Sequence, residues 1–214
     1  MDSERIGIVV GLTAEARIAR RSGCRVEVGG GTAAGAEAAV RRLLAANVSM
    51  LVSFGLAGGL DPSLPPGCLL VPEWVLTGGR RIATDVSVNQ RLGGFTPHGL
   101  LGAASVAASV AEKRALWAAT GCAAVDLESG AVAFAASAAG VPFGVLRAIC
   151  DPADRDLPPA ALAALDAGGA IGFWRIMVSV LGNPGQVPGL VRLAGDAKAA
   201  REALVVRVGE RFRR

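Results

Sequence analysis

The chain has few aromatic side chains and few side chains that bind metals. Of its 214 residues 4% are aromatic, none is Tyr, and His98 is the one histidine. So few rings argue against a stacking platform for single-stranded nucleic acid. The four cysteines include no C-x-x-C pair, so the ligand spacing of a Cys/His zinc site is missing. We therefore expect no metal, no cofactor, no nucleic-acid partner and no disulfide framework, as is typical of a reducing compartment.

Charge is also scarce, at 19% of the residues, and it is unevenly distributed. Residues 1–185 carry 15 basic and 15 acidic side chains, whereas residues 186–214 carry seven basic and three acidic ones. Apolar residues recur among the arginines of this tail. We expect one domain over 1–185 and a basic amphipathic helix over 186–214. That helix either packs on the domain with a solvated polar face or lies on anionic lipid headgroups.

No stretch of the sequence has the pattern of a membrane span. Two stretches of 18 residues, 43–60 and 129–146, lack charge, but small and polar residues interrupt the first, and Gly140 and Pro142 interrupt the second. Each divides better into a helix, a turn and a buried strand. The apolar run after Arg5 has five residues, too few for the core of a signal peptide. We expect a cytoplasmic protein that meets the inner membrane face through its tail at most.

Short apolar runs alternate with helical segments along the chain. This alternation predicts an α/β fold, a single domain with a mixed, mostly parallel central sheet flanked by helices. In the first helix Thr13 is expected to be the N-cap, and in a later one Lys113 is expected to face solvent. Strands are predicted at 5–10, 26–28, 50–53, 68–71, 81–84, 100–104, 123–125 and 143–149, and helices at 14–21, 33–46, 110–119, 127–139 and 159–181.

Polar side chains stand at the carboxyl ends of several predicted strands, where parallel α/β sheets place their sites. Carboxylates at these ends, with one arginine inside an apolar strand, predict an acid/base site. The residues are Glu15 after the first strand, Asp126 and Glu128 after the strand at 123–125, and Arg147 within and Asp151 after the strand at 143–149.

Structural roles remain open for each of these side chains. Glu15 sits in the first turn of a helix, where its charge suits the helix dipole, and Glu128 can do the same for the next predicted helix. Asp126 is expected to be the N-cap of the next helix, and Arg147 to be the buried partner of a carboxylate. Asp151 precedes a proline and can start a turn. His98 is expected in a surface loop.

Four motifs, in chain order over about residues 5–155, resemble the nucleoside phosphorylase/nucleosidase superfamily. They are Gly7-Ile8-Val9-Val10-Gly11 with Glu15, Phe54-Gly55-Leu56-Ala57-Gly58-Gly59-Leu60, Val125-Asp126-Leu127-Glu128-Ser129-Gly130-Ala131 and Val145-Leu146-Arg147-Ala148-Ile149-Cys150-Asp151. A finer resemblance, carried by Gly58-Gly59-Leu60-Asp61-Pro62 and by Asp151-Pro152-Ala153-Asp154-Arg155, is to the hopanoid-biosynthesis-associated phosphorylases. The resemblance implies cleavage of adenine from a 5′-modified adenosine such as adenosylhopane, by a homodimer.

The resemblance also implies roles for single residues. Asp151 protonates purine N7, Glu128 accepts hydrogen bonds from the ribose hydroxyls, and Leu127 packs against the sugar. Asp126 belongs to the same ribose-binding signature, and the backbone of Ala57 and Gly58 approaches the purine. Either Glu15 is the base for water, or Arg147 contacts inorganic phosphate as a co-substrate.

One departure from the family pattern lies in the glycine-rich segment. Nucleosidases of the superfamily carry Ser or Thr where Leu56 stands, and phosphorylases often carry an arginine in this segment. Because that arginine is missing, we favour hydrolysis. A general methylthioadenosine-type nucleosidase, a purine nucleoside phosphorylase and a non-catalytic nucleoside-binding module are the alternatives.

Overall fold

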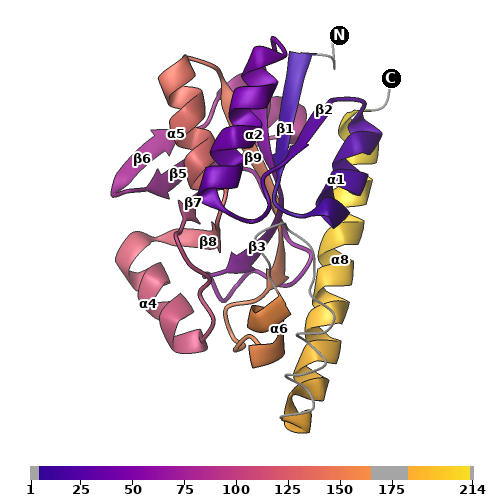
Figure 1. Ribbon diagram of the computed structural model, residues 1–214. Coiled ribbons are helices and arrows are strands. Elements are labelled where there is room, and N and C mark those ends of the chain that lie inside the picture. The colour runs from indigo at the N-terminus through magenta and orange to yellow at the C-terminus, as the bar shows by residue number, and fades with distance from the viewer. Residues whose placement is uncertain (1–4, 165–182, 213–214) are drawn as a thin grey trace.

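The computed structural model describes residues 5–164 and 183–212, and its centre is a sheet of nine strands (Figure 1). The strands are β1 (Ile6–Val10), β2 (Arg25–Val28), β3 (Met50–Gly59), β4 (Leu69–Leu70), β5 (Pro72–Thr77), β6 (Arg80–Ala83), β7 (Thr96–Gly102), β8 (Cys122–Asp126) and β9 (Phe143–Asp151). The helices are α1 (Thr13–Ala19), α2 (Ala33–Ala45), α3 (Val86–Leu92), α4 (Val110–Thr120), α5 (Ser129–Ala139), α6 (Pro159–Ala164) and α8 (Val187–Arg211), with 3₁₀ turns at Arg20–Ser22 and Pro184–Gln186.

The sheet is mixed and mostly parallel, as predicted. Its main path runs β2-β1-β3-β8-β7-β5-β6, and β9 pairs with β3 and with β4. Parallel pairs join β1 to β2 and β3, β3 to β9, and β7 to β5 and β8, whereas β3–β8, β4–β9 and β5–β6 are antiparallel. Since β1, β3 and β9 are parallel neighbours, their carboxyl ends meet at one edge.

Helices cover both faces of this sheet (Figure 1). Helices α2 and α5 enclose one apolar core with buried residues such as Val40 and Val132. On the other face α1, α3 and α8 enclose a second core. Helix α8 contributes Ala200, Leu204 and Val208, which recur every four residues and so form one buried stripe. This helix therefore packs along the body, next to α1 and β9.

Several local predictions are wrong or incomplete. Helix α1 begins at Thr13, and Leu12 is its N-cap, so Thr13 lies inside the helix. His98 lies on strand β7, not in a loop. Strand β5 and helix α3 were not predicted, since their apolar residues follow no clear period. Of the helix predicted at 159–181, α6 covers the beginning, and 165–181 lies outside the described residues.

Candidate active site

Arg147 lies on β9 opposite Gly55 of β3, and three carboxylates surround it. Its Nη2 atom lies 2.6 Å from Asp126 Oδ2 and 3.1 Å from Glu128 Oε2. Its side chain is 1% exposed, so these ion pairs are shielded from water. We call Glu15, Asp126, Glu128 and Arg147 the arginine cluster. With every member ionised, it carries two more negative than positive charges.

Two serines and one backbone carbonyl complete the contacts of the guanidinium. Nη2 also donates to Ser53 Oγ at 2.8 Å and to Ser129 Oγ at 3.2 Å, and Nη1 donates to the Leu56 carbonyl at 3.2 Å. Arg147 Nε is buried and has no partner among the described residues. The guanidinium is therefore held by groups of the protein. Arg147 is the buried partner of carboxylates, as expected.

Glu15 is fixed by backbone hydrogen bonds from the two residues after β1 and from Leu56 within β3. Its Oε2 accepts from Gly11 N at 3.0 Å and Leu12 N at 2.7 Å, and its Oε1 accepts from Leu56 N at 2.8 Å. Burial raises the pKa of Glu15, while Arg147 and these three N–H groups oppose that shift. The three donors thus fix the orientation of the Glu15 carboxyl group, although the net effect of its surroundings is a raised pKa.

Asp126 is the last residue of β8, and Glu128 lies in the turn between β8 and α5. Asp126 Oδ1 accepts from Ser129 N at 3.1 Å, and Asp126 Oδ2 is hydrogen-bonded to Ser129 Oγ. The N-cap position of α5 is nevertheless Glu128, not Asp126 as predicted, because the helix begins at Ser129. Leu127 therefore lies in the turn. The pKa of Glu128 is raised to about 7, chiefly by burial. The positive charge of Arg147 lowers this pKa, and the negative charges of Asp126 and Glu15 raise it.

Two glycines of the sequence motifs leave space for these carboxylates. A Cβ atom on Gly11 would lie 2.3 Å from Glu128 Oε1. One on Gly55 would lie 2.4 Å from Glu15 Oε1 and 2.7 Å from Arg147 Nη1, and Gly55 has a φ of +153°, which L residues rarely adopt. The glycine-rich segment of β3 therefore makes room for the arginine cluster.

Gly55→Ala is expected to lower the free energy of unfolding by about 2 kcal/mol or more, because its methyl group displaces two buried charged groups and strains the backbone. The matched control is Gly58→Ala on the same strand. Its Cβ would lie 3.4 Å from Val125 Cγ1, an ordinary contact, and its φ is not in the restricted range. Urea denaturation of both variants measures the difference. Equal losses would show that the space beside Glu15 is not needed.

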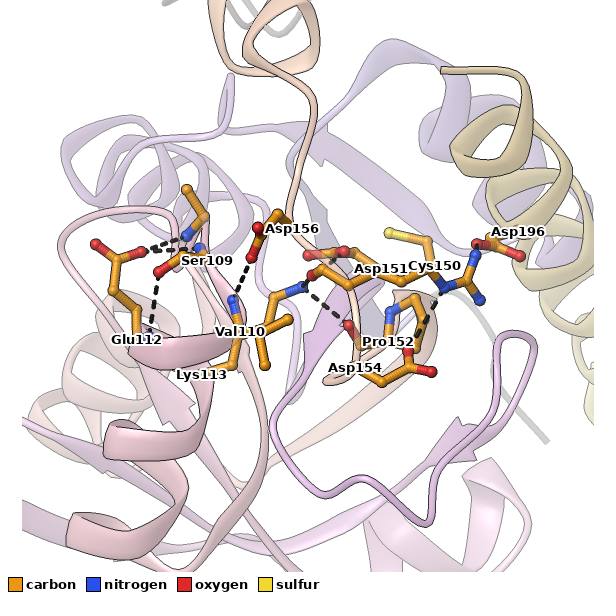
Figure 2. A network of polar contacts seen from close by, with 12 residues as sticks. Ser109, Val110, Glu112, Lys113, Cys150, Asp151, Pro152, Asp154, Asp156 and Asp196 are labelled. Carbon is orange, nitrogen blue, oxygen red and sulfur yellow. Dashed lines mark hydrogen bonds and ion pairs between the residues drawn. The ribbon is translucent and has the colours of Figure 1, made fainter. Parts of the chain in front are cut away.

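Asp151 lies at the end of β9, and its partner is a lysine that we expected to face solvent. Lys113 is 0% exposed, and its Nζ atom donates to Asp151 Oδ1 at 2.8 Å (Figure 2). The same ammonium donates to the carbonyls of Pro152 at 2.9 Å and Arg155 at 2.7 Å. The prediction for Lys113 is therefore wrong. The sequence did hold a signal, because Val110, Leu116 and Lys113 share one face at helical spacing.

The other oxygen of Asp151 lies beside β3. Gly58 pairs with Asp151 across the sheet, and a Cβ atom there would lie 3.6 Å from Asp151 Oδ2. A cavity of about 150 Å³ adjoins Asp151, lined by the loop at 152–158 and by α8. Burial raises the pKa of Asp151, although Lys113 opposes this shift. Along an extended strand, Asp151 and Arg147 are about 13 Å apart between Cα atoms.

The predicted site residues thus form two groups at the edge where β1, β3, β8 and β9 end. Glu15, Asp126, Glu128 and Arg147 make one group, and Asp151 with Lys113 makes the other. Across residues 5–164 and 183–212 no group of three His, Cys, Asp or Glu side chains is arranged to hold a metal ion. In the same ranges no helix has the length and apolarity to span a membrane.

Comparisons with known proteins agree with this architecture. The model of the phosphorylase superfamily matches residues 100–167, which include Asp126, Glu128, Arg147 and Asp151. No curated protein matches the chain.

Solved structures match over nearly the whole chain. The futalosine hydrolase of Helicobacter pylori has a TM-score of 0.68 and 18% identity, over 97% of this chain and 98% of that chain. The 5′-methylthioadenosine/S-adenosylhomocysteine nucleosidase of Helicobacter pylori has a TM-score of 0.68 and 18% identity, over 98% of this chain and 100% of that chain. The corresponding nucleosidase of Colwellia psychrerythraea, solved in complex with adenine, has a TM-score of 0.66 and 18% identity, over 85% of this chain and 96% of that chain. The chain therefore has the α/β fold of the nucleoside phosphorylases, and residues 100–167 match the phosphorylase superfamily in sequence.

Proposed function

We propose that this chain is a nucleosidase, which hydrolyses the N-glycosidic bond of an adenosine-type nucleoside and releases adenine. The fold supports a nucleoside as substrate, because the structural neighbours include nucleosidases and one of them was solved with adenine. Hydrolysis rests on the state of Arg147. Its guanidinium is enclosed by carboxylates, serines and a carbonyl, so a phosphate dianion at this place meets a net negative charge.

The two groups of the site supply the chemistry at opposite ends of the substrate. Asp151 donates a proton to N7 of the purine while the C1′–N9 bond breaks, and the electron pair of that bond goes to adenine. Water attacks C1′, and Glu15 accepts its proton. Adenine and a ribose with a free anomeric hydroxyl leave the site. Burial raises the pKa of Asp151, which favours the protonated form that proton donation requires.

The remaining predicted residues bind the sugar and the base. Glu128 accepts hydrogen bonds from the ribose 2′- and 3′-hydroxyls, and Leu127 packs against the sugar. The backbone of Ala57 and Gly58 lies beside the purine, and a Cβ atom on Gly58 would lie 3.6 Å from Asp151 Oδ2. We assign Asp126 to holding Arg147, because its carboxylate points at Arg147 and Ser129.

Leu56 stands where known nucleosidases carry a hydroxyl residue, but its backbone still links Glu15, the proposed base for water, to Arg147. Its backbone N–H donates to Glu15 Oε1, and its backbone carbonyl accepts from Arg147. Backbone groups therefore join the base to the arginine, so a leucine side chain is tolerated here.

For the 5′ position we propose an apolar substituent, with adenosylhopane as the substrate that the sequence resemblance indicates. Formation of a homodimer and peripheral contact of the tail with a membrane are proposed on the same ground. On α8, Val191 is 67% exposed and directly precedes the exposed Arg192, a pairing that suits a lipid headgroup.

The decisive experiment measures adenine release from adenosine, 5′-methylthioadenosine and long-chain 5′-alkylthioadenosines, with and without inorganic phosphate. We expect a rate that phosphate does not change, a free ribosyl product, and a higher kcat/KM for the long chains. A requirement for phosphate with a ribose 1-phosphate product would overturn hydrolysis. Equal kcat/KM across the series would overturn the apolar 5′ substituent. No release from any nucleoside would leave a binding module.

A further inference from the structure

Lys113 is buried in a helix whose other described side chains are exposed or half-buried. A lysine is seldom fully buried unless it is paired. Its three N–H donors are all used, on Asp151 Oδ1 and the carbonyl of Pro152 (Figure 2) and on the carbonyl of Arg155. The ammonium therefore joins α4 to the end of β9 and to the loop that follows it.

Attachment of α4 to this loop does not by itself require a buried charge. Val110 N donates to Asp156 Oδ1 at 2.6 Å, and Leu157 N donates to the Ala108 carbonyl at 2.7 Å. The N-terminus of α4 also has its own cap, because Ser109 Oγ accepts from Glu112 N at 3.2 Å. Burying an ammonium costs solvation energy, which an apolar side chain avoids. Attachment of α4 to the loop thus does not explain why the buried side chain at position 113 is charged.

We propose that Lys113 is a positioning residue for Asp151: it holds Oδ1, so that Oδ2 beside Gly58 is the carboxyl oxygen presented to purine N7. This inference rests on the proposed function. The pair is ordered in this geometry before substrate binds, which removes the cost of orienting the proton donor during the reaction. Lys113 itself does not touch the substrate.

The charge of Lys113 also sets the pH range over which Asp151 carries its proton. Burial raises the pKa of Asp151 and Lys113 opposes that shift. Two other charged groups act on Asp151, namely Arg155 in the following loop, which lowers its pKa, and Asp196 on α8, which raises it. Arg155 and Asp196 are paired at 2.6 Å, so they partly cancel. Removing Lys113 thus raises the pKa of Asp151, and activity persists to higher pH.

The test is the pH profile of kcat/KM for adenine release by Lys113→Met, Lys113→Gln and the control Ser109→Ala. Loss of orientation is expected to lower the maximal kcat of both Lys113 variants about 10–100-fold. At the alkaline pH where wild type retains a tenth of its maximum, each Lys113 variant is expected to retain about half of its own maximum. Ser109→Ala removes a cap from the same helix without changing charge, so it lowers the unfolding midpoint and leaves the profile in place.

Failure of this inference and failure of the proposed function give different results. An active wild type whose alkaline limb does not move in either Lys113 variant overturns the inference alone. The same holds if Ser109→Ala moves the limb as far as Lys113→Met does. Adenine release by neither wild type nor variants overturns the proposed function, and the inference with it. Lys113→Gln keeps two donor hydrogens, so it carries the test if Lys113→Met does not fold.

Discussion

Asp151→Asn is expected to lower kcat for adenine release about 10²–10⁴-fold. Asparagine has nearly the same shape, and its amide oxygen can keep the hydrogen bond from Lys113 Nζ that Asp151 Oδ1 accepts at 2.8 Å. Its NH₂ group can donate a hydrogen bond to purine N7 but cannot transfer a proton to it. Binding of adenine should therefore change little while turnover falls. Adenine release at saturating substrate measures kcat, and titration calorimetry with adenine measures affinity.

The matched control is Asp154→Asn, three residues further along the same loop. The Asp154 side chain is 72% exposed and lies 3.5 Å from Arg155, so its substitution should leave kcat within about twofold of wild type. Wild-type turnover in Asp151→Asn would remove Asp151 from the chemistry. A loss of adenine affinity as large as the loss of kcat would show that Asp151 binds the base without protonating it.

The arginine cluster was largely predictable from the sequence. Asp126 and Glu128 come at the end of one apolar run, Glu15 follows another by five residues, and Arg147 interrupts a third. Since β1, β3 and β9 are parallel, they end at a common edge, and side chains at their carboxyl ends meet there. Strand β8 is antiparallel to β3, so this rule does not account for Asp126 and Glu128, which reach the edge through the pairing of Val125 with Gly58. The glycines of the motifs can be recognised in the sequence, but their structural role cannot. That Gly11 and Gly55 make room for Glu128 and Glu15 depends on contacts between distant parts of the chain.

Lys113 was missed because its environment comes from a segment 38 residues away in sequence. Its charge predicts a side chain that faces solvent, whereas its spacing from Val110 and Leu116 is that of one helix face. A lysine on an apolar stripe has two explanations: its aliphatic stem covers the core while the ammonium reaches water, or it meets a buried anion. The sequence does not decide between them, since the anion lies beyond β8 and α5.

The cap of α1 shows the same limit on a smaller scale. Threonine is a preferred N-cap residue, so Thr13 was the local choice. In the structure Glu15 reaches back to the N–H groups of Gly11 and Leu12 and to Leu56 on another strand. A contact across the sheet thus fixes where the helix begins, and propensity does not.

Arg147→Met is expected to lower the free energy of unfolding by about 3–5 kcal/mol at pH 8, because it leaves three buried carboxylates without their cation. Arg42→Met is the matched control. Arg42 also lies 2.6 Å from a carboxylate, that of Glu27, but the two side chains are 51% and 35% exposed. Removal of this surface pair should cost no more than about 1 kcal/mol. Urea denaturation of both variants and wild type measures the two losses.

The loss in Arg147→Met should also shrink as the pH falls. In the folded protein the pKa of Glu128 is raised from 4.5 to about 7, so its protonated form favours folding below pH 4.5 and that stability is lost as the pH rises through 7. Without Arg147, whose charge lowers this pKa, Glu128 keeps its proton to still higher pH. At pH 5 the Glu128 carboxyl group is neutral in the variant and needs no cation. At pH 8 it must either ionise without a partner or stay protonated at a pH where the unfolded chain is ionised, and both lower the free energy of unfolding. Unfolding at both pH values tests this argument, and an equal loss at pH 5 and pH 8 would mean that the charge of Arg147 does not stabilise the fold through Glu128.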